Sequence, residues 1–114
     1  MAVEISNEGF EQLVDRAWER IPDRFKTELE NVLIVIEDEP PKSARILGLY
    51  SGVPITQRLE YAGAMPDQIT LYQGPLQRYC CDEEELAEQV YVTLVHEIGH
   101  YFGLDDDRLH ELNW

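Results

Sequence analysis

Apolar residues recur at every fourth position in the last third of the chain, and this repeat constrains the fold more than any other feature. An α-helix has about 3.6 residues per turn, so such a repeat forms one stripe that faces a core. Asp82 can cap the start of the helix, with Glu85 completing a capping-box pattern. Gly103 can end it, because glycine accepts the left-handed conformation after a last helical turn. The pattern therefore predicts one long helix, whose stripe consists of Leu86, Val90, Leu94, Ile98 and Phe102.

The second half of this helix carries the motif H-E-x-x-H-x-x-G-x-x-D, which runs from His96 to Asp106. Residues four apart on a helix differ by only about 40° in direction and about 6 Å in rise. The imidazoles of His96 and His100 can therefore converge on one ion, and neutral imidazole is a good ligand for zinc. Glu97 lies about 100° round from His96, within reach of a water on that ion. We predict a zinc site in which Glu97 is the general base for peptide-bond hydrolysis.

The third ligand is less closely specified by the motif than the two histidines. A catalytic zinc site takes three protein ligands and keeps one position open. Asp106 has the right offset after the turn at Gly103 and is the predicted third ligand. Its neighbours Asp105 and Asp107 are suited to cap a final helix, and either acid can compete for the role. His110 follows one turn later, as an alternative ligand, as a residue that orients Asp106, or as a surface histidine.

The charge balance limits the kinds of partner. The 114 residues include 23 acidic and 9 basic ones, for a net charge of −14. Such a charge repels nucleic acid and anionic membrane surfaces, and it favours cations and basic peptides. The longest aliphatic run, residues 32–36, is too short to cross a membrane, and the N-terminus lacks the layout of a secretory leader. We expect a cytoplasmic protein with reduced Cys80 and Cys81, peptide or protein partners, and no nucleic-acid or membrane partner.

The rest of the chain predicts a single α+β domain over residues 1–114. Ser6 can cap a first helix, and Pro22 suits the start of a short continuation over residues 23–30. The β-branched run 32–36 predicts a central strand that is buried on both faces. Two further strands are predicted at residues 47–50 and 69–72, and two loops at residues 37–41 and 56–65.

On these motifs the chain resembles the minimal zincin-like metallopeptidases of bacteria, small single-domain proteins that end shortly after H-E-[IL]-[AG]-H-[HY]-F-G-[ILM]-x-[DE]. The resemblance is close over residues 93–112 and extends to residues 47–54 and 66–72. It implies a reduced zincin-like fold, with a mixed sheet of about three to four strands on an N-terminal helix and the motif helix. It also implies a helix-borne metal site and a peptidase activity. In such a fold, residues 69–72 would form the edge strand above the motif helix, where an extended peptide can add.

Two other functions fit the same residues. A chain this small has little material for a specificity pocket, so it can be a metal-binding or interaction module without proteolysis. A metal-dependent endoribonuclease is the other alternative, because bacterial rRNA-processing enzymes carry a related H-x-x-x-H-x-x-G-x-x-H pattern. Glu97 and the net charge of −14 argue against the nuclease. In the peptidase, Tyr72 and Tyr101 are candidates to hydrogen-bond an oxyanion, although tyrosines near a cleft are usually packing residues.

Overall fold

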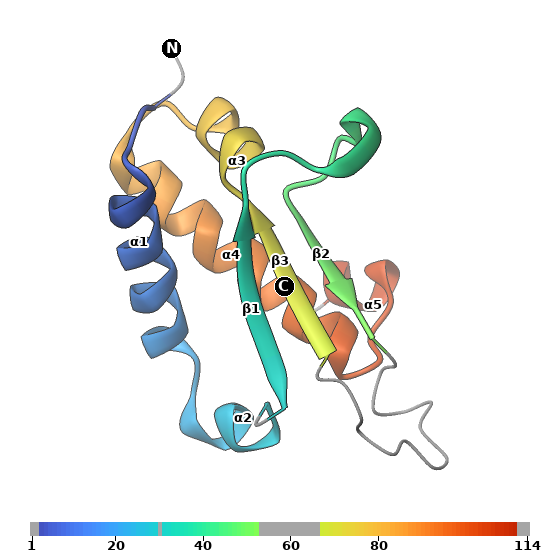
Figure 1. Ribbon diagram of the computed structural model, residues 1–114. Coiled ribbons are helices and arrows are strands. Elements are labelled where there is room, and N and C mark those ends of the chain that lie inside the picture. The colour runs from blue at the N-terminus through green and yellow to red at the C-terminus, as the bar shows by residue number, and fades with distance from the viewer. Residues whose placement is uncertain (1–2, 30, 53–66, 112–114) are drawn as a thin grey trace.

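The computed structural model describes residues 3–29, 31–52 and 67–111, which form a three-stranded sheet with helices (Figure 1). The predicted loop at residues 56–65 lies outside the described residues, as do the last three positions of the chain. In chain order the elements are α1 (Asn7–Arg20), α2 (Asp23–Glu28), β1 (Val32–Glu37), the 3₁₀ turn η1 (Pro41–Ser43), β2 (Gly48–Ser51), β3 (Asp67–Tyr72), α3 (Gln73–Tyr79), α4 (Glu83–Tyr101) and α5 (Asp106–Glu111).

The sheet is mixed, with the strand order β1-β3-β2. β1 pairs with β3 in parallel, whereas β2 pairs with β3 in the antiparallel sense. This confirms the predicted small mixed sheet of an α+β fold. Figure 1 shows α4 crossing behind the sheet and α1 running beside it, with β1 at one edge and β2 at the other.

The predicted order of the strands was wrong. The aliphatic run of β1 lies at an edge, where Leu33 is 50% exposed, and β3 occupies the centre. The hydrophobicity of the sequence predicts the wrong strand order, because β3 is central although it contains polar residues. Its buried polar side chains are tolerated since they find hydrogen-bond partners. The hydroxyl of Tyr50 donates to the buried Asp67 at 2.6 Å, and the amide of Gln68 donates to Thr70 at 3.0 Å. A central strand can therefore contain polar residues when their partners lie within the same sheet.

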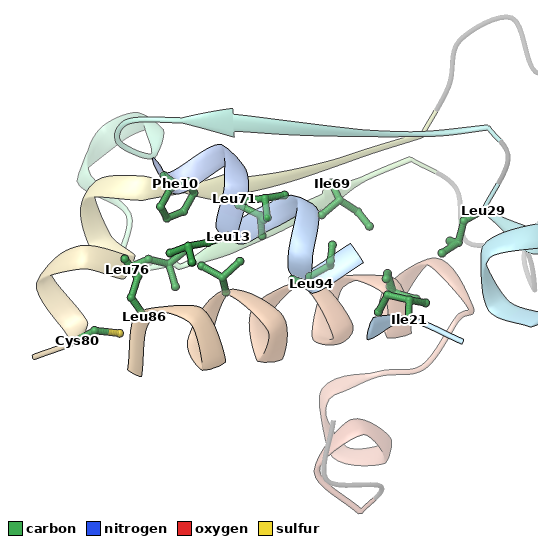
Figure 2. Packing of buried hydrophobic residues seen from close by; sticks show 14 of the residues in the cluster. Phe10, Leu13, Ile21, Leu29, Ile69, Leu71, Leu76, Cys80, Leu86 and Leu94 are labelled. Carbon is green, nitrogen blue, oxygen red and sulfur yellow. The ribbon is translucent and has the colours of Figure 1, made fainter. Parts of the chain in front are cut away.

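The core fills the space between one face of the sheet and the helices (Figure 2). Ile69 and Leu71 point from β3 towards side chains of α1, α3 and α4. The predicted stripe of α4 supplies much of this core, because Leu86, Val90 and Leu94 are fully buried. The other fully buried hydrophobic residues of the cluster come from elsewhere in the chain, namely Phe10 of α1, Ile69 and Leu71 of β3, Leu76 of α3, and Cys80 after α3.

The ends of the main helices follow the predicted capping residues. The Ser6 hydroxyl accepts from the Gly9 amide at 3.0 Å at the start of α1. At the start of α4, the Asp82 carboxylate accepts from the Glu85 amide at 2.7 Å, and the Glu85 carboxylate accepts from the Cys81 amide at 2.6 Å. The first bond satisfies an amide that the helix itself leaves without a partner, and the second holds the residue before the cap. The start of the motif helix is therefore fixed by local chemistry.

Both cysteines are free thiols, as expected. Burial raises the pKa of the Cys80 thiol to about 11, and the acidic Glu85 adds to the effect. A thiol in this environment is protonated near neutral pH and is a poor nucleophile. Among the described residues, no helix combines the length and the apolar character that crossing a membrane requires.

Candidate metal centre

The end of α4 determines where the motif residues lie. Gly103 has a φ of 86°, the left-handed conformation that glycine adopts readily. Its amide donates to the His100 carbonyl at 2.9 Å, and the Leu104 amide donates to the Gly99 carbonyl at 3.0 Å. These two bonds form a Schellman motif, which ends the helix and reverses the chain. The predicted helix end at Gly103 is confirmed, and the turn brings the residues that follow back towards His100.

The same turn fixes the orientation of the His100 ring. The Nδ1 atom of His100 lies 3.0 Å from the Leu104 carbonyl oxygen. A carbonyl oxygen only accepts hydrogen bonds, so this contact requires a proton on Nδ1. In the neutral ring the lone pair is then on Nε2, which is the arrangement of a metal-binding histidine held by an outer hydrogen bond. Leu104 therefore positions the His100 ring through its backbone carbonyl. A backbone contact of this kind cannot be recognised from a sequence motif.

Asp106 meets both imidazoles with a single oxygen. Its Oδ1 atom lies 3.2 Å from Nε2 of His96 and 3.3 Å from Nε2 of His100. The neighbouring Asp105 caps α5, because its carboxylate accepts from the Arg108 amide at 2.9 Å. Of the two acids, Asp106 is thus the one directed at the histidines. The side chain of His110, the alternative ligand, lies outside the described residues.

The spacing of these donors suits a tetrahedral zinc ion. Zinc bound at about 2.0–2.1 Å in a regular tetrahedron holds neighbouring donor atoms about 3.3–3.4 Å apart. The two distances from Asp106 Oδ1 to the imidazole nitrogens, 3.2 and 3.3 Å, match that separation closely. Two imidazoles and one carboxylate are also a donor set that zinc takes in catalytic sites. The residues present therefore fit the predicted ion.

Glu97 differs from the other acids of the site by its burial. It is only 7% exposed, whereas the Asp106 side chain is 79% exposed. Burial raises the pKa of Glu97, while His100, His96 and a hydrogen bond from the backbone amide of Tyr50 act in the opposite direction. One ligand atom from each of His96, Glu97 and His100 can lie within 4.8 Å of the others. A carboxylate with a raised pKa beside a metal site is suited to take up and return a proton.

An open cleft of about 570 Å³ gives access to these groups. Strand β2 forms one wall, and the end of α4 with the following turn forms the other. Gly48 allows the two walls to approach, because a Cβ atom there would lie 2.7 Å from the Thr93 methyl group. A side chain at this position would push β2 away from α4, and with it the amide of Tyr50. The strand above the motif helix is therefore β2, and the prediction that residues 69–72 take this place was wrong.

The tyrosines proposed as oxyanion donors are engaged elsewhere. The Tyr101 hydroxyl donates to the Glu28 carbonyl at 2.8 Å, which ties α4 to the end of α2. Tyr72 is buried and is not among the residues that line the cleft. The hydroxyl of Tyr50, which does line the cleft, donates to Asp67. Their contribution to the structure is packing and support of the walls.

These features define a small α+β protein with a candidate metal site at the end of one helix. The chain belongs to the zincin-like metallopeptidase family, whose profile matches residues 29–114, and this confirms the resemblance seen in the sequence. Among solved structures, the chain is similar to a conserved hypothetical protein from Thermo thermophilus. The two are 27% identical, the TM-score is 0.60, and the match covers 86% of this chain and 94% of that one. A search of curated proteins finds no match.

One contact explains how α5 holds Asp106 in place. Leu109 of α5 is fully buried, and a Cβ atom on Gly99 would lie 2.3 Å from its Cδ2 atom. We expect Gly99→Ala to displace Leu109 and to draw Asp106 away from the imidazoles. Zinc affinity should fall about 10- to 100-fold, as it does when a group that positions a ligand is lost. Competition with a chromophoric chelator measures this affinity.

A second substitution provides the control for this prediction. Leu109→Val shortens the side chain that meets the new methyl group, so Gly99→Ala combined with Leu109→Val should recover part of the lost affinity. Leu109→Val alone sets the reference for the double variant. Wild-type zinc affinity in Gly99→Ala would show that the contact between α4 and α5 does not position Asp106.

Proposed function

We propose that the protein is a zinc-dependent peptidase, with His96, His100 and Asp106 as ligands and Glu97 as the general base. The observation that carries this proposal is the convergence of both Nε2 atoms on Asp106 Oδ1, at 3.2 and 3.3 Å, beside a buried glutamate. The membership of the zincin-like metallopeptidase family supports the same assignment.

The residues of the chain have separate tasks in this mechanism. A zinc ion held by these three ligands would supply Lewis-acid chemistry, with a polarised substrate carbonyl and a bound water whose pKa is about 7. Glu97 accepts a proton from the attacking water and returns it to the leaving nitrogen, for which its raised pKa is suited. The Tyr50 amide holds the Glu97 carboxylate in position, and the Leu104 carbonyl holds the His100 ring.

Within the described ranges no strand pairs with the outer edge of β2, and this edge offers a place for the substrate backbone. The Tyr72 amide donates to the Leu47 carbonyl at 3.0 Å, and hydrogen-bonded pairs alternate along an antiparallel ladder. Gly48 and Tyr50 therefore direct their backbone groups away from β3, and the Tyr50 amide reaches Glu97 in this way. An extended peptide that pairs with the backbone of Gly48, beyond the Tyr50 amide that Glu97 occupies, would lie along the cleft beside His96. We propose β2 as the strand to which the substrate adds.

The walls and charges of the cleft suggest the chemistry of the substrate. A recess of about 300 Å³ adjoins Glu97 and is lined by apolar side chains that include Ile46, Leu47 and Val92. Asp105 and Asp106 border the main cleft, and the net charge of the chain is −14. We propose extended, basic peptides with an apolar residue beside the scissile bond, and no nucleic-acid substrate. Both cysteines are free, which agrees with a reducing compartment such as the cytoplasm.

Cleavage that depends on a metal is the direct test of this function. The purified protein, loaded with zinc, should cleave unstructured basic peptides that carry a quencher and a fluorophore. The activity should disappear with a chelator and return when zinc is added back, as the rise in fluorescence reports. A peptide set with glutamate in place of lysine is the matched control for the charge preference. Cleavage that persists in excess chelator would contradict the proposal.

A metal-binding module without proteolysis is the second candidate, and one observation favours it. Among the described residues that line the cleft, Tyr50 is the one neutral side chain with a hydroxyl donor, and that hydroxyl is bonded to Asp67. An oxyanion would therefore depend on the metal and on backbone amides for its stabilisation. Binding of one zinc ion per chain, without cleavage of any of the test peptides, would favour this module over the peptidase.

A further inference from the structure

The sheet edge opposite the candidate metal centre carries a second groove. A groove of about 700 Å³ runs between α1 and β1. Its floor is apolar, with Val14 and Trp18 from α1 and the alternating residues Val32, Ile34 and Ile36 from β1. These β1 residues are only partly buried against the core. β3 separates β1, which lines this groove, from β2, which lines the candidate metal centre, so the two surfaces are separate (Figure 1).

The backbone of β1 at this edge is ready to pair with another strand. The Asp67 amide donates to the Asn31 carbonyl at 3.1 Å, so residue 31 directs its backbone groups towards β3. Because these directions alternate along a strand, Ile34 and Ile36 direct their amides and carbonyls to the free side. Within the described ranges no strand pairs with this side. The features that usually protect an edge, such as proline, a bulge or a lysine, do not occur in Val32–Glu37.

The charges around the groove indicate the kind of strand that fits. Glu11 and Asp15 line it together with one cation, Lys26, among the described residues. The ammonium group of Lys26 is already engaged, 3.9 Å from the Asp23 carboxylate and 5.6 Å from the ring centre of Trp18. A second copy of the chain would bring another net charge of −14 to an acidic groove, which disfavours self-pairing. A basic strand avoids this repulsion.

We propose that the edge of β1 and the adjoining groove bind an extended, basic segment of a partner protein. The segment adds to the sheet as a fourth strand beside β1. Every second side chain of the segment faces the groove, and this set includes both apolar residues, which pack on Val14, Trp18 and Ile34, and basic residues, which reach Glu11 and Asp15. The backbone hydrogen bonds supply affinity that is independent of sequence, and the side chains that face the groove supply the selectivity.

A peptide titration of the full chain tests this surface. The probe is a short acetylated peptide that repeats valine-threonine-lysine-threonine, so that valine and lysine share one face of the strand, and its control has glutamate in place of lysine. In ¹⁵N NMR spectra, the lysine peptide should shift the amide signals of residues 32–37, and the glutamate peptide should leave them unchanged. No shift with the lysine peptide, equal shifts with both peptides, or shifts confined to the metal cleft would overturn the proposal.

Two variants separate the contributions of charge and backbone. Replacing Glu11 by Gln and Asp15 by Asn should weaken lysine-peptide binding about 2- to 5-fold per charge at low salt. Ile34→Pro removes an amide that points away from β3, so the sheet keeps its own hydrogen bonds while peptide binding is lost. Tyr79→Lys, at a 61% exposed site outside the groove, is the control and should bind normally. Unchanged binding in both groove variants would contradict the proposed strand addition.

The oligomeric state in solution tests whether a second copy of the chain, and not a basic partner, occupies the groove. Sedimentation of the chain alone should show a monomer at low and at physiological salt, because like charges oppose pairing of two β1 edges. A dimer that Ile34→Pro converts to a monomer would identify a second copy as the occupant and would overturn the assignment to a basic partner.

Discussion

Glu97→Gln is expected to retain zinc and to lose peptidase activity. Glutamine has nearly the same shape as glutamate, and its side-chain oxygen can still accept the hydrogen bond from the Tyr50 amide. It cannot take a proton from the attacking water, and loss of a general base costs about 10²- to 10⁴-fold in rate. We expect kcat/KM to fall by this factor while the zinc content and the melting temperature stay at the wild-type level.

A comparison with Glu97→Asp tests whether an acidic group is required at this position. Aspartate keeps an acidic group but shortens the side chain, so it should retain more activity than glutamine if proton transfer is the task of this position. Peptide cleavage at the wild-type rate in Glu97→Gln would rule out Glu97 as the base. Loss of zinc from Glu97→Gln would instead make Glu97 a ligand, in place of Asp106.

His96→Ala is expected to lose both zinc and activity. The Nε2 atom of His96 lies 3.2 Å from Asp106 Oδ1, and without it two ligands remain. The loss in zinc affinity should exceed the about 100-fold that removal of an outer partner can cost. Because the His96 side chain is 34% exposed, its removal leaves little empty space and the chain should still fold. Zinc analysis after dialysis and the rise in melting temperature on adding zinc measure the effect.

The alternative ligand provides the control for this prediction. If Asp106 completes the site, His110→Ala should keep its zinc, whereas Asp106→Ala should lose most of it. The opposite outcome would transfer the role of third ligand from Asp106 to His110. Zinc retained by His96→Ala at the wild-type affinity would show that the ion binds at another place.

The elements that depend on local chemistry could be predicted from the sequence. Helix α4 begins at a capping pair and ends at a glycine turn, and each of these requires only a few neighbouring residues. The two histidines share one side of that helix because of its periodicity alone. The offset after Gly103 favours Asp106 over Asp105 as the ligand, but it excludes neither, since both are acids next to the same turn. The structure separates them by their contacts, since Asp105 accepts from the Arg108 amide and Asp106 lies against both imidazoles.

The elements that depend on pairing across the sheet could not be predicted. The run in β1 is aliphatic enough for a central strand, but strand order is set by which neighbours pair and not by hydrophobicity alone. The hydrogen bond from Tyr50 to Glu97 joins a backbone amide to a side chain far away in the sequence. Because almost every residue has a backbone amide, the sequence does not indicate which one bonds Glu97. The room that Gly99 leaves for Leu109 is likewise visible only once α5 is in place.

The positions of the proposed ligands along the chain have a consequence for folding. All of them lie within one short segment, from the last turns of α4 to the first residue of α5, so capturing an ion there requires the closure of only a small loop. The glutamate of that segment, in contrast, is oriented by a strand that joins it from a remote part of the chain. Mild denaturation that loosens the sheet should therefore abolish turnover at denaturant concentrations where the terminal segment still retains its ion.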